Sequence, residues 1–404
     1  MITQIYNIGK IVTWDNNSNN IIILESKDLE VIIKNDVIIS VGKKTNNHQT
    51  DQSINAKGGL ITPGFIDCHT HPIFSGNRSY EFELRMKGAT YQEISEKGGG
   101  IKFSIKQLRE SSKEQIFEQS LKRVNTFLKN GTTTIEAKSG YGLTLKDEIK
   151  SLEVIKMLNQ ESDLNIIPTF MGAHDFPLEY QNNKDGYVDL ICEEMIPRIS
   201  DEKLAMFCDV FCEQGYFTVS QTEKILRTGL KYGLLPRLHA DEFIDSGAAQ
   251  LAADLKISSA DHLMHSSIEG LKAMADNNVI SVILPGTTFF LGKKEYVDTN
   301  KILDVGGEVA IASDYNPGSC TIQSMPMIMF LSNLYCNLSL ELSFKACTYN
   351  AAKALNIDND YGLIKEGYKA DLLIWDIENL SDIPYMFNNN DRYINIIKNG
   401  KIIN

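Results

Sequence analysis

The stretch LITPGFIDCHTH, residues 60–71, joins an apolar strand to a cluster of polar side chains. Comparable apolar runs recur along the middle of the chain, separated by segments with the periodicity of amphipathic helices. This alternation is typical of a parallel sheet built from βα units. The predicted strands cover residues 60–67, 132–138, 165–172, 205–212, 235–239, 258–262, 279–284 and 308–313. The predicted helices include residues 113–129, 145–159, 221–232, 246–255, 268–276 and 339–355.

Eight strands with interleaved helices between residues 59 and 355 match the size of a (β/α)8 TIM-like barrel, an α/β fold. A doubly wound sheet is the alternative, and it usually carries a glycine-rich turn directly after its first strand. Gly98-Gly99-Gly100 does not follow a strand, so we interpret it as a loop. The sequence therefore favours the barrel.

The two ends of the chain have a different sequence pattern from the middle, with short β-type runs separated by Asn, Asp and Lys turns. Neither end is long enough to bury a β core alone. We expect residues 1–58 and 356–404 to pack together as one small β-sandwich domain beside the barrel of residues 59–355.

Composition excludes several classes of protein. The chain has 404 residues, of which 43% are hydrophobic and 23% charged, as in ordinary globular proteins. Lys plus Arg number 40 against 52 Asp plus Glu, and a net charge of −12 gives no general attraction for nucleic acid. The apolar runs are far shorter than a membrane span, and the N-terminus lacks the apolar region of a secretory signal. We expect a cytoplasmic protein with a small-molecule substrate.

The rare polar residues fall at the ends of the predicted strands, where barrels of this type carry their chemistry. Five of the seven histidines occupy such positions: His69, His71, His174, His239 and His262. His69 and His71 are two residues apart, so both side chains would point to one face of an extended strand. With His239 and the strand-eight carboxylate Asp314 they would form a set of three nitrogens and one oxygen for a metal ion. Zn²⁺ is the default ion, and Fe²⁺ and Mn²⁺ are alternatives.

A divalent ion in such a set makes water a nucleophile at neutral pH, and a proton shuttle is then needed. Glu242, three residues beyond His239, suits a general acid/base role. His262 could polarise the water or a substrate carbonyl, or could instead hold Asp314 in place.

These residues resemble the amidohydrolase superfamily, which combines a metal-bearing barrel with a small β domain made from both chain ends. The resemblance narrows to the imidazolonepropionase family on longer strings, which are Asp67-Cys68-His69-Thr70-His71, Phe82-Glu83-Leu84-Arg85, Gly88-Ala89-Thr90-Tyr91, Lys138-Ser139-Gly140-Tyr141-Gly142-Leu143, Leu238-His239-Ala240-Asp241 and Asp314-Tyr315-Asn316-Pro317-Gly318. Members of that family hydrolyse the cyclic amide of 4-imidazolone-5-propanoate to N-formimidoyl-L-glutamate in histidine degradation.

The resemblance implies roles for individual residues. It implies one ion, Zn²⁺ or Fe, held by His69, His71, His239 and Asp314, and catalysis by Glu242, His262 and Asp314. It further implies substrate contacts from Arg78, Tyr141, His174, Asn316, Gly318 and Ser319. Arg78 would bind the substrate carboxylate with its fork, with Arg85 as a second candidate. Family precedent also implies a homodimer and no carboxylated lysine, although a bridging role for Lys138 remains open from the sequence.

Two other functions remain open. An aromatic deaminase on the same barrel would share the metal ligands and the His239–Glu242 spacing, but would release ammonia. A metal-free interaction protein on the same scaffold is disfavoured because all four ligands are present.

Overall fold

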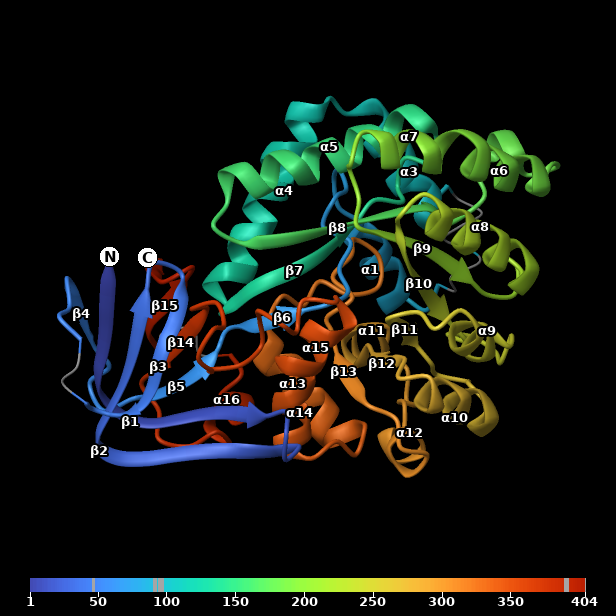
Figure 1. The fold of residues 1–404 in the computed structure, drawn as a ribbon. Helices are drawn as coiled ribbons and strands as arrows, with labels where there is room; N and C mark the ends of the chain where they lie inside the picture. Colours follow the sequence, from blue (N-terminus) through green and yellow to red (C-terminus); the bar gives the residue numbers. More distant parts are fainter. Residues whose placement is uncertain (46–47, 90–92, 94–97, 389–391, 404) are drawn as a thin grey trace.

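The computed structural model describes residues 1–404 apart from 46–47, 90–92, 94–97, 389–391 and 404 (Figure 1). Thr90 and Tyr91, which belong to one of the strings quoted above, lie outside the described residues. Within the described residues, the chain forms two eight-stranded sheets. One is built from both ends of the chain and the other from its middle.

The middle of the chain forms the predicted barrel. Its parallel strands follow one another in chain order around the sheet. They are β6 (Phe65–Asp67), β7 (Thr132–Lys138), β8 (Asn165–Ala173), β9 (Phe207–Cys212), β10 (Leu235–Ala240), β11 (Ser259–His262), β12 (Ile280–Ile283) and β13 (Val309–Ile311). Sequential parallel order in a closing sheet rules out the doubly wound alternative.

Helices cover the outside of these strands (Figure 1). They include α4 (Lys113–Lys129), α5 (Leu145–Glu161), α8 (Val219–Lys231), α9 (Ala248–Asp254), α10 (Ile268–Asp276), α13 (Met325–Tyr335), α14 (Leu340–Ala346) and α15 (Tyr349–Ala354). The shorter helices are α1 (Ser79–Met86), α3 (Ile101–Glu110), α6 (Lys184–Leu190), α7 (Ile196–Asp201), α11 (Pro285–Phe290) and α12 (Thr299–Asp304). Capping boxes start α4 at Ser112 and α8 at Thr218, which satisfies main-chain N–H groups of the first turn.

The predicted helix over residues 339–355 is two helices. Thr348, between α14 and α15, has φ −128°, which is not helical. The apolar pattern continues across the break because both helices pack against β13.

The terminal sheet has the strand order β16-β15-β14-β5-β1-β2-β3, with β4 also paired to β1. Its strands are β1 (Ile2–Asp15), β2 (Asn20–Lys34), β3 (Val37–Lys43), β4 (Gln52–Asn55), β5 (Leu60–Pro63), β14 (Leu372–Trp375), β15 (Tyr393–Lys398) and β16 (Lys401–Ile403). Both chain ends therefore contribute to one β structure, as predicted. It buries an apolar core of its own, separate from that of the barrel.

The predicted strand over residues 60–67 is two strands. β5 lies in the terminal sheet between β1 and β14, whereas β6 opens the barrel. Gly64 separates them where the backbone passes so close to Thr133 that a Cβ would lie 2.3 Å from the Thr133 Oγ1. The division of the chain into domains at residues 58 and 356 stays a prediction.

Trp375 connects the terminal sheet to the barrel. Its ring is fully buried and contacts Phe65 edge to face, with centroids 5.8 Å apart. Its Nε1–H donates to the Thr62 Oγ1 at 2.9 Å. The Trp375 ring therefore packs across the boundary between the two β structures, and its hydrogen bond lies within the terminal sheet.

Candidate active site

The first and last barrel strands meet beyond their ends, at the polar residues that follow them. The main-chain N–H of Asp314 donates to the His69 carbonyl oxygen at 3.0 Å, and the main-chain N–H of His71 donates to the Tyr315 carbonyl oxygen at 2.8 Å. These bonds close the sheet at its carboxyl edge. They also fix His69, His71 and Asp314 on adjacent backbone.

The four predicted metal ligands converge. The Nε2 atoms of His69 and His71 are 3.2 Å apart. The Asp314 Oδ1 lies 3.6 Å from the His69 Nε2 and 3.5 Å from the His71 Nε2. The ring of His239 lies 4.5 Å from that of His69, centroid to centroid. Ligand atoms each about 2.1 Å from a tetrahedral Zn²⁺ lie about 3.4 Å apart, so the donors of His69, His71 and Asp314 fit such an ion. The donor of His239 comes together with those of His69 and His262.

The protonation of the histidines suits metal binding. The Nδ1 of His69 lies 2.7 Å from the Asp261 Oδ2, and the Nδ1 of His239 lies 3.0 Å from the Asp209 Oδ1. Ionised carboxylates only accept hydrogen bonds, so each Nδ1 carries the proton and each Nε2 is left to bind a cation. Burial holds the pKa of His69, His71 and His239 well below the usual range, which keeps these rings neutral.

Asp314 is held by two neighbours. The Thr287 Oγ1–H donates to the Asp314 Oδ2 at 2.5 Å. The main-chain oxygen of Asp314 accepts from the Asn316 Nδ2 at 2.7 Å. This leaves Oδ1 facing the two histidines. Burial raises the pKa of Asp314 to about 7 in the metal-free protein.

Glu242 and His262 lie side by side next to these ligands, with 3.7 Å between Glu242 Oε2 and His262 Nε2. Burial raises the pKa of Glu242 to about 7. A narrow hollow of about 10 Å³, with room for about one water molecule, lies against both side chains and the nearby Lys293. The Asp314 Oδ2 accepts from Thr287, and both roles predicted for His262 stay predictions. The His262 ring is also close enough to His69 and His239 to share an ion with them.

Arg78 and Arg85 both reach the loop that follows Asp314. Arg78 donates from Nε and Nη2 to the two carboxylate oxygens of the buried Glu81, at 2.9 and 2.7 Å. A Cβ on Gly318 would lie 2.3 Å from the Arg78 Nη1, so only glycine leaves the guanidinium its place. Arg85 donates from Nη1 and Nη2 to the Gly318 carbonyl oxygen, at 3.1 Å each. The role of Glu81 was not predicted from the sequence.

Tyr141 and His174 lie beside the histidine cluster. The His174 ring stacks on that of His71 with centroids 5.2 Å apart, and the Tyr141 ring lies 5.2 Å from His174. The His174 Nδ1–H donates to the Gly140 carbonyl oxygen at 3.0 Å. Burial lowers the pKa of His174 to about 4.

Asn316 organises the loop that carries Gly318 and Ser319. Its Oδ1 accepts from the main-chain N–H groups of Gly318 and Ser319 at 2.8 and 2.7 Å. The loop is therefore held rigidly beside Arg78, which fits a place in substrate binding for all three residues.

Beneath the histidines lies a layer of fully buried charges that sequence reasoning did not assign. It consists of Glu136, Lys138, Asp209, Arg237 and Asp261. The Lys138 ammonium donates to the Glu136 Oε1 at 2.7 Å and to the Asp209 Oδ2 at 2.5 Å. Its use in these ion pairs gives no support to a lysine that bridges two ions. Charged residues within otherwise apolar strands were the signal available in the sequence.

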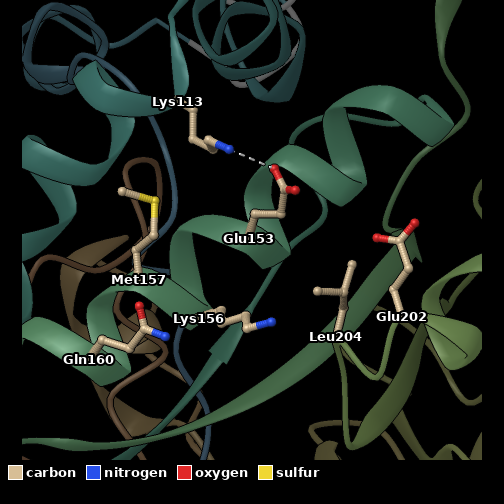
Figure 2. Close-up of a pocket in the computed structure, with 7 residues that line it drawn as sticks. All are labelled: Lys113, Glu153, Lys156, Met157, Gln160, Glu202 and Leu204. Atoms are coloured by element: carbon tan, nitrogen blue, oxygen red, sulfur yellow. Dashed lines mark hydrogen bonds and ion pairs between the residues drawn. The ribbon is translucent and has the colours of Figure 1, made fainter.

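A larger hollow, of about 440 Å³, lies on the outer layer of helices. Figure 2 shows the residues that line it. Lys113 and Glu153, from α4 and α5, form an ion pair at its wall. Among the described residues, neither group of possible metal ligands lies at this hollow, so the barrel mouth remains the candidate site.

Comparison with known proteins identifies relatives for the chain. Residues 247–403 match the model of the Amidohydrolase family. The chain is 45% identical to the imidazolonepropionase of Geobacillus sp. (strain WCH70), over 87% of this chain and 82% of that protein. It is 39% identical to the imidazolonepropionase of Clostridium tetani (strain Massachusetts / E88), over 95% and 92% respectively.

Solved structures share the fold at low identity. An adenosine deaminase from Xanthomonas campestris with bound zinc is similar with a TM-score of 0.73 and 16% identity, over 99% of this chain and 92% of that one. A guanine deaminase from C. acetobutylicum has a TM-score of 0.73 and 17% identity, over the full length of both chains. At these identities the likeness shows the architecture alone.

Proposed function

The chain belongs to the imidazolonepropionase family, and from that premise we propose how its site carries out the reaction. The protein is a hydrolase of a cyclic amide C–N bond, which converts 4-imidazolone-5-propanoate to N-formimidoyl-L-glutamate in histidine degradation. The observation that carries the proposed mechanism is the convergence of His69, His71, His239 and Asp314 beside Glu242.

A divalent cation in this set would supply Lewis-acid polarisation and would make water nucleophilic at neutral pH. Glu242 takes the proton from the attacking water, and its raised pKa suits it both to accept that proton and to give it back. His262, with its Nε2 3.7 Å from Glu242, stabilises the oxygen on which negative charge develops, with His174 as the alternative. Glu242 or Asp314 then protonates the departing ring nitrogen.

The substrate lies between the two sides of the barrel mouth. Tyr141 and His174 flank the imidazolone ring from β7 and β8. Arg78, whose guanidinium is oriented by Glu81, binds the propionate beside the loop of Asn316, Gly318 and Ser319. An arginine is needed here because the protein as a whole has a net charge of −12 and repels the anionic substrate.

The remaining attributes belong to the same proposal. The ion is Zn²⁺ or Fe, since neutral imidazoles with one carboxylate suit either. The enzyme acts in the cytoplasm as a homodimer and binds neither nucleic acid nor membrane. Within the described residues, no helix combines the length and apolar character needed to cross a bilayer.

The deciding experiment generates imidazolone propionate from urocanate in situ under anaerobic conditions, and follows loss of the ring absorbance with and without a chelator. We expect chelator-sensitive loss without release of ammonia, restored by Zn²⁺ or Fe²⁺. Ammonia release would indicate the deaminase. No loss in metal-replete protein would overturn the assigned substrate.

A further inference from the structure

The layer of buried charges beneath the metal ligands has a regular plan. Each of the two cations pairs with one carboxylate that contacts a histidine ligand. Lys138 donates to Asp209, which lies 3.0 Å from the His239 Nδ1. The Arg237 Nη2 donates at 2.9 Å to Asp261, which lies 2.7 Å from the His69 Nδ1.

Glu136 joins the two halves of this layer. Its Oε1 lies 2.7 Å from the Lys138 Nζ and 3.3 Å from the Arg237 Nε, and it also accepts from the Thr169 Oγ1 at 2.6 Å. Every side chain concerned is fully buried. Buried charges are retained only when they are paired, so this layer holds its members in fixed positions.

The two oxygens of Asp209 have different partners. Its Oδ2 accepts from Lys138, and only its Oδ1 is left for His239. The ammonium of Lys138 can only donate, so whatever group stands at Oδ2 must be an acceptor. Lys138 thereby anchors the Asp209 carboxylate with Oδ1 toward His239. It would also decide which end of an amide at position 209 faces the histidine, because the two ends of an amide differ.

We propose that Lys138 is a positioning residue of the metal centre, which acts through Asp209 to set the tautomer of His239. With Lys138 and Asp209 in place, His239 carries its proton on Nδ1 and offers Nε2 to the ion. The inference rests on the metal site proposed above. It concerns a lysine and an aspartate that contact neither the substrate nor the ion.

The test is Asp209→Asn, which keeps the shape of the side chain. Lys138 will select the amide oxygen, so the amide NH₂ will face His239. The Nδ1 of His239 must then accept, which moves the ring proton to Nε2 and blocks the ligand atom. We expect ¹⁵N NMR of histidine-labelled metal-free protein to show this change of tautomer, and the Kd for Zn²⁺ to rise by about 10- to 100-fold.

Adding Lys138→Met to Asp209→Asn should partly restore Zn²⁺ affinity. Without the ammonium, the amide can turn its oxygen to His239 again. A merely structural role of Lys138 would make the double variant worse than the single one, and that result would overturn the inference. If the double variant does not fold, an unchanged tautomer in Asp209→Asn alone overturns it.

Asp371→Asn is the matched control. Asp371 and Lys398 form another buried pair, with 2.7 Å between Oδ2 and Nζ, in the terminal sheet. The Kd of the Asp371→Asn variant for Zn²⁺ should equal that of the wild-type protein. Failure of the wild-type protein to bind Zn²⁺ would overturn the metal site itself, whereas wild-type affinity in Asp209→Asn would overturn only the inference about Lys138.

Discussion

The N–H of Asp314 donates to the carbonyl oxygen of His69 at 3.0 Å, so the two residues that close the barrel are also two of its proposed metal ligands. Barrel closure and assembly of the site are therefore one structural event. Ligands that come from chain segments about 245 positions apart are held by the same ladder of hydrogen bonds that gives the fold its stability.

Glu242→Gln should lower kcat by about 10²-fold or more, because a positioned proton shuttle contributes on that scale. Metal content should stay at the wild-type level, since Glu242 is not among the proposed ligands. Steady-state kinetics and metal analysis check this, with the exposed Glu295→Gln as the matched control. Wild-type turnover in Glu242→Gln would remove the residue from the mechanism.

The pH profile should show an acid limb that belongs to Glu242. A general base works only when deprotonated, so kcat/KM should fall as the pH drops through the pKa of this group. Burial raises that pKa to about 7, and a bound cation would lower it, so the limb should lie at or below pH 7. The pH profile of the residual activity of Glu242→Gln should lack this acid limb. If the variant showed the same acid limb, the limb would belong to another group.

Arg78→Ala should raise KM strongly with a smaller change in kcat, because the guanidinium contributes charge-assisted hydrogen bonds to the substrate carboxylate. Arg227→Ala is the control, since Arg227 makes the same kind of pair with Glu223 on an exposed helix face. An unchanged KM in Arg78→Ala would point to Arg85 or Tyr141 instead.

Gly318→Ala should reproduce the effect of Arg78→Ala on KM without loss of thermal stability. The added Cβ would lie 2.3 Å from the Arg78 Nη1, and the end of a long side chain moves aside at low cost. The double variant should be no worse than either single variant, because both act on the same contact. Additive effects on KM would show that Gly318 acts on the substrate independently of Arg78.

Trp375→Ala should lower the free energy of unfolding by about 3–5 kcal/mol, the usual loss for a large buried aromatic side chain. The ring is fully buried between the two β structures and its Nε1–H bond to Thr62 would be lost. Urea denaturation measures the change. Tyr385→Ala, at a side chain 80% exposed, should change stability by less than about 0.5 kcal/mol. Equal stabilities would show that the boundary contributes little.

Much of the barrel could be predicted from the sequence because a strand buried on both faces is a continuous apolar run, and because chemistry gathers where such runs end. The division between β5 and β6 could not be predicted. Both halves of residues 60–67 are equally apolar. Strand β14, which pairs with β5 in the terminal sheet, is remote from it in sequence.

The histidines of the site could be placed from the sequence because each lies at or near the carboxyl end of a strand. Their partners could not be placed. Whether Asp209 meets His239 depends on the register between β9 and β10, and whether Arg78 meets Glu81 depends on where α1 begins. Such pairings arise from tertiary geometry, which a pattern of residue types does not contain.

The position of β5 between β1 and β14 has a consequence for biosynthesis. During translation β1 and β5 emerge from the ribosome early, but the strand that pairs with the other edge of β5 begins only at residue 372. For most of translation the nascent chain therefore exposes an unpaired strand edge, which is a template for aggregation. A chain released between residues 311 and 372 would contain all the barrel strands and still lack the strand that covers this edge. Quality control should therefore recognise such truncated products by their incomplete terminal sheet rather than by their catalytic centre.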